Sequence, residues 1–251
     1  MELRKTEHLS RMEAYQQRIF YRDQLKKEAF SFQEEYYRIF GDLMLEAFQL
    51  KIECIRLKKE ISYCQLCINQ NREINQNELN TMIEKIMEDY QKELNQLSMH
   101  VNLSKEAKTI SPKDLMEIKK IYRRIVKKIH PDLNPESFKK REVKDLWDRM
   151  MLAYQCNQLE ELKEIEVLLE FITKDASNHS IENLEERLEK LNEEIERIVN
   201  TNPYQYKFLL NDENEVKEQK DNYLREIKEY QKYKNDLEEV LKQFEMKQVF
   251  N

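Results

Sequence analysis

The amino-acid sequence predicts an all-α protein in which elongated helical hairpins or coiled coils flank a small helical module. Three observations predict this class. The 251 residues include one glycine and four prolines, which leaves little turn chemistry for a sheet. Charged residues make up 37% of the chain and hydrophobic residues 40%, a balance typical of long helices. The apolar residues also recur at alternating steps of three and four, which is the period of one helix face.

The first region, residues 1–103, is expected to form a long helical hairpin. Its first apolar seam runs from Leu25 to Ile68 and breaks phase only around Gly41, where we expect the seam to drift or the helix to bend. A second apolar run, ending at Val101, is expected to fold back on the first. The many aromatic side chains near the start of the chain suit a partner surface, self-association or an intramolecular core.

The last region, residues 176–251, repeats this organisation. A seam with steps of three and four begins at Ile181, the segment 202–204 interrupts it, and a second seam ends at Phe244. We expect the two seams to pair as an antiparallel hairpin across Pro203. The sequence leaves open whether the seams pair within one chain or between two chains, so a homodimer is one of the possible partners.

The region between the hairpins, residues 104–175, is expected to hold a small helical module. Ser111 followed by Pro112 is a typical helix start, because serine caps the free N–H groups and proline suits the first helical position. This helix should end at Ile129, since Pro131 disfavours the helical conformation of the residue before it.

The helix that ends at Ile129 is amphipathic on a helical wheel. Its aliphatic face consists of Ile118, Ile121, Ile125 and Ile129. We expect this face to pack on a helix over residues 138–155, whose apolar side includes Trp147, Met150, Ala153 and Tyr154. A further helix is expected over residues 159–171. The opposite face of the first helix is basic and carries Lys119, Lys120, Arg123, Arg124 and Lys127.

The charge of this region opposes that of the whole chain. The formal net charge of the protein is −6, which argues against a general nucleic-acid binder. Between Pro112 and Lys144, however, eleven Lys or Arg face five Asp or Glu, a net charge of +6, so the rest carries −12. Like charges spaced four apart on a helix repel each other. The basic face is therefore expected to meet a specific acidic surface, the alternative being a solvated face that binds nothing.

The segment Glu117–Asn134, which reads EIKKIYRRIVKKIHPDLN, resembles the second helix and following loop of the J domain, the module of DnaJ-type co-chaperones. The positions Trp147, Met150, Ala153 and Tyr154 resemble the start of the third helix of that family. The resemblance covers about residues 111–158. A J domain normally begins with a short helix that bears a Leu-Gly pair, which this chain lacks, and the run ending at Val101 is the segment that can substitute for it.

The resemblance implies that the module binds a DnaK-type heat-shock chaperone and stimulates its ATP hydrolysis. Carried over residue by residue, the chaperone-binding set is Lys119, Tyr122, Arg123, Arg124, Lys127, His130, Pro131 and Asp132. The cations would meet an acidic surface of the chaperone's nucleotide-binding domain, with Tyr122 at the flank. His130 and Pro131 would hold the loop, and Asp132 would engage the chaperone's arginine-centred interdomain coupling. Because the hydrolysis belongs to the partner, the chain itself would be no enzyme and would need no cofactor.

Two other functions fit the same sequence. The chain could be a structural or interaction coiled-coil protein with a degenerate, inactive J-like domain. It could also bind nucleic acid through the basic helix, although the net charge of −6 argues against this. If the chain is instead a co-chaperone, its helical arms would select a client or scaffold protein or a location in the cell.

The remaining residues favour simple roles. The pair Cys64 and Cys67 lies within an apolar helical pattern, and a second pair for a zinc site is missing, so buried reduced thiols are favoured over metal or redox chemistry. The histidines at positions 8, 100 and 179 lie apart from other ligand residues, so no metal site is expected. No apolar run is long enough for a membrane span, and no signal peptide begins the chain, so we expect a cytoplasmic protein.

Overall fold

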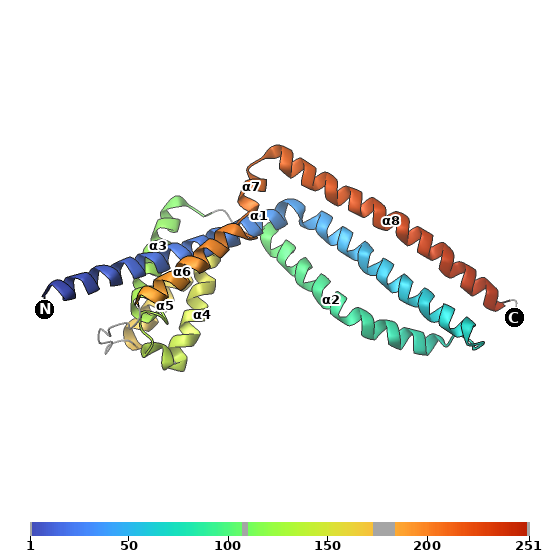
Figure 1. Cartoon of the computed structure of the whole chain (residues 1–251), viewed down its shortest axis with the longest axis horizontal. Helices are drawn as coiled ribbons and strands as arrows, with labels where there is room; N and C mark the ends of the chain where they lie inside the picture. Colours follow the sequence, from blue (N-terminus) through green and yellow to red (C-terminus); the bar gives the residue numbers. More distant parts are fainter. Residues whose placement is uncertain (1, 107–109, 173–183, 250–251) are drawn as a thin grey trace. The chain divides into compact units, whose positions relative to one another are not determined.

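The structure is a computed structural model, and it describes residues 2–106, 110–172 and 184–249. Within those ranges it contains helices and no strand, so the protein is all-α, as the composition and periodicity predict (Figure 1). The chain divides into two compact units. Unit 1 consists of Met1–Gln33 and Lys108–Lys207, and unit 2 consists of Glu34–Ala107 and Phe208–Asn251. Helix α1 (Glu2–Asn69) contributes residues to both.

Unit 1 gathers most of the shorter helices around the first part of α1. They are α3 (Pro112–Ile129), the 3-10 helix η1 (Ser137–Lys139), α4 (Arg141–Gln155), α5 (Leu159–Ile172) and α6 (Leu184–Asn200). The start of α3 has the predicted cap, because the Asp114 N–H donates to Ser111 Oγ over 3.1 Å and Pro112 is the first helical residue. The helix ends at Ile129, also as predicted. Helix α7 (Tyr206–Leu210) has residues in both units.

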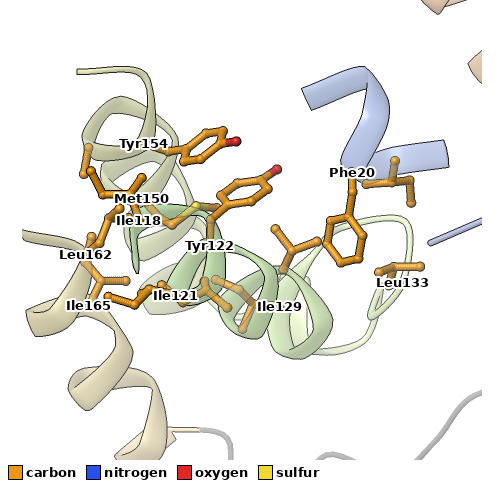
Figure 2. Close-up of a cluster of buried hydrophobic side chains, with 14 of the residues drawn as sticks. Phe20, Ile118, Ile121, Tyr122, Ile129, Leu133, Met150, Tyr154, Leu162 and Ile165 are labelled. Atoms are coloured by element: carbon orange, nitrogen blue, oxygen red, sulfur yellow. The ribbon is translucent and has the colours of Figure 1, made fainter. Parts of the chain in front are cut away.

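The core of unit 1 forms where α3 meets α4, α5 and α1. Figure 2 shows Ile118 and Ile121 of α3 directed toward Leu162 and Ile165 of α5, while the rings of Tyr122 and Tyr154 lie one above the other. The two tyrosine rings are stacked, with centroids 3.8 Å apart and planes 16° from parallel. Ile118, Ile121, Ile125 and Ile129 are all at most 1% exposed. The aliphatic face of α3 is thus fully covered, which fixes the direction of its basic face.

Unit 2 is built on the second part of α1, with α2 (Gln76–Glu106) and α8 (Glu213–Val249) packed against it (Figure 1). Helix α2 folds back on α1 as predicted, because Cys67 clusters with Leu79 at the turn and Val101 packs on Gly41 at the other end. Helix α8 packs on the same helix through Leu237, which joins Cys54 and Leu57 in one apolar cluster. An open groove of about 520 Å³ lies between these helices and is lined by residues that include Tyr37, Phe48, Leu97 and Tyr223.

The antiparallel hairpin expected for residues 176–251 is wrong. Helix α6 belongs to unit 1, where Arg11 pairs with Glu185 over 2.6 Å and Leu191 joins the core around α3. Helix α8 belongs to unit 2, where it packs on α1 instead. Ile181, the expected first residue of that seam, lies outside the described residues.

The module of residues 104–175 likewise does not form a unit alone, since unit 1 adds residues 1–33 and α6 to it. The expectation that the run ending at Val101 substitutes for a first helix is also wrong. Val101 lies in unit 2, and the helix that covers α3 is the segment of α1 around Tyr15, Ile19 and Phe20, which share the core with Ile129.

Candidate functional site

The loop after α3 is held by a small set of backbone hydrogen bonds. The carbonyl oxygen of His130 accepts from the N–H groups of Leu133 (3.0 Å) and Asn134 (2.7 Å). The side-chain amide of Asn134 donates to the Lys127 carbonyl over 2.9 Å, which satisfies one of the free carbonyl groups at the end of α3. Pro131 adds a fixed backbone angle within this turn. The loop therefore has a defined conformation in the absence of any partner.

His130 is the buried centre of the loop, with 1% of its surface exposed. Its Nδ1 atom accepts a hydrogen bond from the backbone N–H of Asp132 over 3.0 Å. The edge of the ring meets Trp147 of α4, with centroids 5.0 Å apart and planes nearly perpendicular. Burial, followed by the charges of Arg22 and Lys26, lowers the pKa of His130 to about 3. The imidazole is therefore neutral at physiological pH and serves as a structural acceptor.

Asp132 lies at the edge of this buried centre and is partly open to solvent. Its side chain is 40% exposed, and its Oδ2 atom lies 4.0 Å from His130 Nδ1, beyond hydrogen-bond distance. The residue thus offers a carboxylate to solvent while its own backbone N–H anchors it to the imidazole. The geometry separates two roles, because His130 fixes the loop and Asp132 presents the charge.

A buried polar network connects the loop with α1 and α6. The hydroxyl of Tyr122 donates to Asp23 Oδ2, and Asp23 is 2% exposed. The guanidinium of Arg22 binds the other oxygen of Asp23 over 2.7 Å and Glu194 over 3.3 Å, and its Nη2 atom lies 3.3 Å from His130 Nε2. Burial and the negative charge of Asp23 raise the pKa of Tyr122. Burial acts to lower the pKa of Arg22, but the carboxylates of Asp23, Glu194 and Asp132 together raise it. The network therefore keeps Arg22 charged and Tyr122 protonated.

The exposed surface of α3 carries the cations that the sequence singles out. Lys119, Arg123 and Lys127 are all exposed, and none forms an ion pair with a carboxylate in the described part of the chain. The guanidinium of Arg123 lies 5.7 Å from the centre of the Phe20 ring. The neighbouring Lys27 of α1 is over the Tyr154 ring, and burial followed by the charge of Lys119 lowers its pKa to about 8. The uncompensated positive charge of this face is thus concentrated near α1.

Two residues of the expected chaperone-binding set differ from expectation. Tyr122 is 2% exposed and lies under the Tyr154 ring, so its position at the flank of a docking surface is wrong. It packs inward because its hydroxyl finds the buried carboxylate of Asp23. Arg124 is exposed, but it pairs with Glu166 of α5 through two N–H groups, at 2.5 and 2.9 Å. Its charge is therefore largely neutralised by Glu166 within the molecule.

The residues expected to form the core of the module lie in one cluster. Met150, Ala153 and Tyr154 of α4 are buried together with the isoleucines of α3, and Trp147 is half-buried at the edge of that cluster beside His130. The structure also brings to the site residues that the sequence reasoning missed. They are Tyr15, Arg22, Asp23, Asn134 and Glu194. The sequence did contain a signal for Asp23. Tyr15, Ile19 and Asp23 are spaced four residues apart, so the carboxylate lies on the helix face where a core residue is expected.

Metal and membrane features are absent from the described residues. No group of three or more His, Cys, Asp or Glu side chains is arranged to hold a metal ion in the ranges that the structure covers. None of the four cysteines forms a disulfide; Cys54, Cys64 and Cys67 are buried, whereas Cys156 is exposed. Within the same ranges, each helix is too short or too polar to cross a bilayer.

Comparison with known proteins returned no relative: no family model, no curated protein and no solved structure matches this chain.

Proposed function

We propose that the protein is a J-domain co-chaperone that binds a DnaK-type heat-shock chaperone and stimulates its ATP hydrolysis. The observation that carries this proposal is the pairing of an exposed basic helix face with a loop that is held by hydrogen bonds. Lys119, Arg123 and Lys127 of α3 are exposed and lack carboxylate partners among the described residues. The same helix leads directly into a loop that buries His130 and exposes the carboxylate of Asp132.

The chemistry of such a surface suits an acidic protein partner. Exposed cations steer association with a complementary surface and fix its register, while a preorganised loop avoids the entropy cost of ordering on binding. The chaperone would supply the reaction, and this chain would contribute the docking contacts. The helices of unit 2, with their open groove, would be free to select a client, a scaffold protein or a second copy.

One observation favours a second candidate, a structural or interaction protein whose J-like module is inactive. Tyr122 is buried and Arg124 is held by Glu166, so two members of the expected chaperone-binding set are not available on the surface. In this alternative the loop would serve only the packing of unit 1, and the function would belong to the helical surfaces.

A single-turnover ATPase assay with a DnaK-type chaperone and the full-length chain separates the two candidates. We expect stimulation by the wild-type protein and its loss in Asp132→Asn, which removes the exposed charge but retains the size of the side chain. Asp148→Asn is the matched control, because Asp148 is an exposed aspartate of α4 in the same unit. Absence of stimulation by the wild-type chain at any concentration would favour the inactive module.

Charge reversal gives a second, independent arm of the experiment. Lys127→Glu should weaken the chaperone complex and reduce its dependence on salt, since fewer opposite charges then meet in the interface. Equal binding by Lys127→Glu and wild type, measured at about 50 mM and 200 mM salt, would contradict docking through the basic face of α3.

A further inference from the structure

We propose that the open groove of unit 2 is a docking site for an amphipathic helix with basic flanks, supplied by a partner protein. The groove has a volume of about 520 Å³ and lies where α2 and α8 flank the second part of α1 (Figure 1). All of its lining residues belong to unit 2. The inference concerns a different unit from the loop around His130, so it does not depend on co-chaperone activity.

The surface of the groove is largely apolar and only half-buried. Met44 and Phe48 of α1, Leu97 of α2 and Tyr223 of α8 line it, and each remains partly open to solvent. Apolar side chains from three helices thus converge on one surface that the described residues leave open. An apolar surface bordered by polar side chains is typical of a protein interaction site.

The aromatic side chains of the groove are held in place by their neighbours. The hydroxyl oxygen of Tyr223 lies 2.9 Å from that of Tyr36, and the Tyr223 ring centroid lies 6.1 Å from that of Phe40. Tyr37 stacks on His100 of α2, with ring centroids 5.9 Å apart. Because these rings are already ordered, a partner would not have to order them on binding.

The shape of the groove suits a helix. Along α1 the lining residues run from Tyr37 to Lys51, which corresponds to about 20 Å, or about four helical turns. The walls are helices whose backbone N–H and C=O groups are bonded internally, so an extended peptide would find no backbone partners there. A helix satisfies its own backbone groups and can place every third or fourth side chain on the apolar surface.

The charges at the border of the groove favour a basic partner. Glu93 of α2 and Glu226 of α8 line it, and neither carboxylate has an ion pair or hydrogen bond among the described residues. Lys51 lines the same groove, but its Nζ atom lies 5.9 Å from the centre of the Phe48 ring instead of pairing with either glutamate. Unit 2 contains 17 Lys or Arg and 24 Asp or Glu, a net charge of −7. Lysine or arginine beside the apolar face of a partner helix would meet both carboxylates.

Fluorescence anisotropy with two synthetic peptides tests the proposal on the full-length chain. Both peptides have about 18 residues, enough for five helical turns, and the same leucine positions on one helix face. One peptide carries lysine on its polar face and the other carries glutamate. We expect the lysine peptide to bind with a Kd at least about tenfold lower at about 150 mM salt. Equal binding of both peptides, or binding of neither, would overturn the proposal.

Charge variants locate the binding site. Glu93→Gln together with Glu226→Gln should raise the Kd of the lysine peptide about five- to tenfold, since two ion pairs are lost. Lys51→Gln should lower this Kd, because a like charge leaves the groove. Glu84→Gln together with Glu229→Gln is the matched control, as it removes the same charge from exposed positions of α2 and α8 that do not line the groove. An equal loss of affinity in the control would show that the peptide responds only to the net charge of unit 2.

Met44→Gln tests the apolar contact and should raise the Kd about tenfold without changing thermal unfolding. If this variant unfolds, hydrogen exchange of the wild-type chain carries the test. The lysine peptide should slow exchange over residues 37–51 and 93–100, and unchanged exchange there would contradict docking in the groove. Sedimentation of the wild-type chain examines the other possible occupant. Self-association that abolishes binding of the peptide would assign the groove to a second copy of this chain.

Discussion

Val101 of α2 packs so closely on Gly41 of α1 that a Cβ atom at position 41 would lie 2.6 Å from Val101 Cγ2 and 2.7 Å from Cγ1. Val101 is fully buried, so the valine has little room to give way. The single glycine of the chain therefore serves the close approach of two helices. The sequence suggested instead that Gly41 marks a drift of the apolar seam.

Gly41→Ala should destabilise unit 2. Alanine in a helix interior gains about 1 kcal/mol over glycine in propensity, but overpacking a buried contact costs about 1–3 kcal/mol. We expect the clash to win, with a lower midpoint of urea unfolding. The double variant Gly41→Ala with Val101→Ala should be less destabilised than the sum of its parts, since the new methyl group fills the space that valine leaves. Simple additivity would contradict direct contact between the two positions.

Tyr122→Phe should destabilise unit 1 by about 1.5–3 kcal/mol, because the buried carboxylate of Asp23 loses a donor. Tyr154→Phe is the matched control, as it belongs to the same stacked pair and its hydroxyl has no hydrogen bond to the described residues. We expect the control to lose less than about 1 kcal/mol. Chemical unfolding of both variants measures the difference, and equal losses would show that the hydroxyl of Tyr122 contributes nothing specific.

Acid should weaken unit 1 through His130. Its pKa is lowered to about 3 in the folded chain from an ordinary value near 6.5. The unfolded chain therefore binds a proton at His130 that the folded chain excludes, and stability falls as the pH drops from about 6.5 toward 3, by up to about 1.4 kcal/mol per pH unit. Unfolding at about pH 6 and pH 5 should show a smaller slope in His130→Gln than in the wild type. Identical slopes would mean that His130 is accessible to protons.

Under the proposed function, Arg124→Gln should affect chaperone stimulation less than Lys127→Gln does. The guanidinium of Arg124 is bound to Glu166, and this ion pair lowers the pKa of Glu166, whereas Lys127 has no such partner within the described residues. A cation already neutralised contributes less to steering an acidic partner. Stimulation assays at equal concentration compare the two variants, and a larger loss for Arg124→Gln would show that the ion pair opens on binding.

Local structure could be read from the sequence with good accuracy, and long-range assembly could not. The cap at Ser111, the end of α3 at Ile129 and the return of α2 toward α1 all follow from short-range chemistry or from periodic apolar residues. The pairing of α6 with α1 rather than α8 does not, because a three-four seam indicates that a helix is covered but never which helix covers it. For the same reason, the apolar pattern could not show that the segment of α1 around Ile19 covers α3.

The candidate site divides in the same way. The basic face and the loop around His130 are contiguous in the chain, so their residues could be found by inspection. Arg22 lies beside the loop, and Asp23 and Glu194 bind Arg22. All three come from helices distant in the chain, where a charged residue is ordinarily interpreted as solvated surface. Only the placement of Asp23 at an apolar step hinted at burial. The burial of Tyr122 depends on its hydrogen bond to Asp23, which the sequence around the loop does not reveal.

The composition of unit 1 has a consequence for biosynthesis. Its first segment, which ends at Gln33, is translated well before α6, the last long helix of the unit. At about 5–20 residues per second, the ribosome needs roughly ten seconds or more to deliver the intervening chain. During that delay the face of α1 that bears Tyr15, Ile19 and Phe20 lacks part of its native cover. The nascent protein would itself present the kind of exposed apolar stripe that general folding machinery protects.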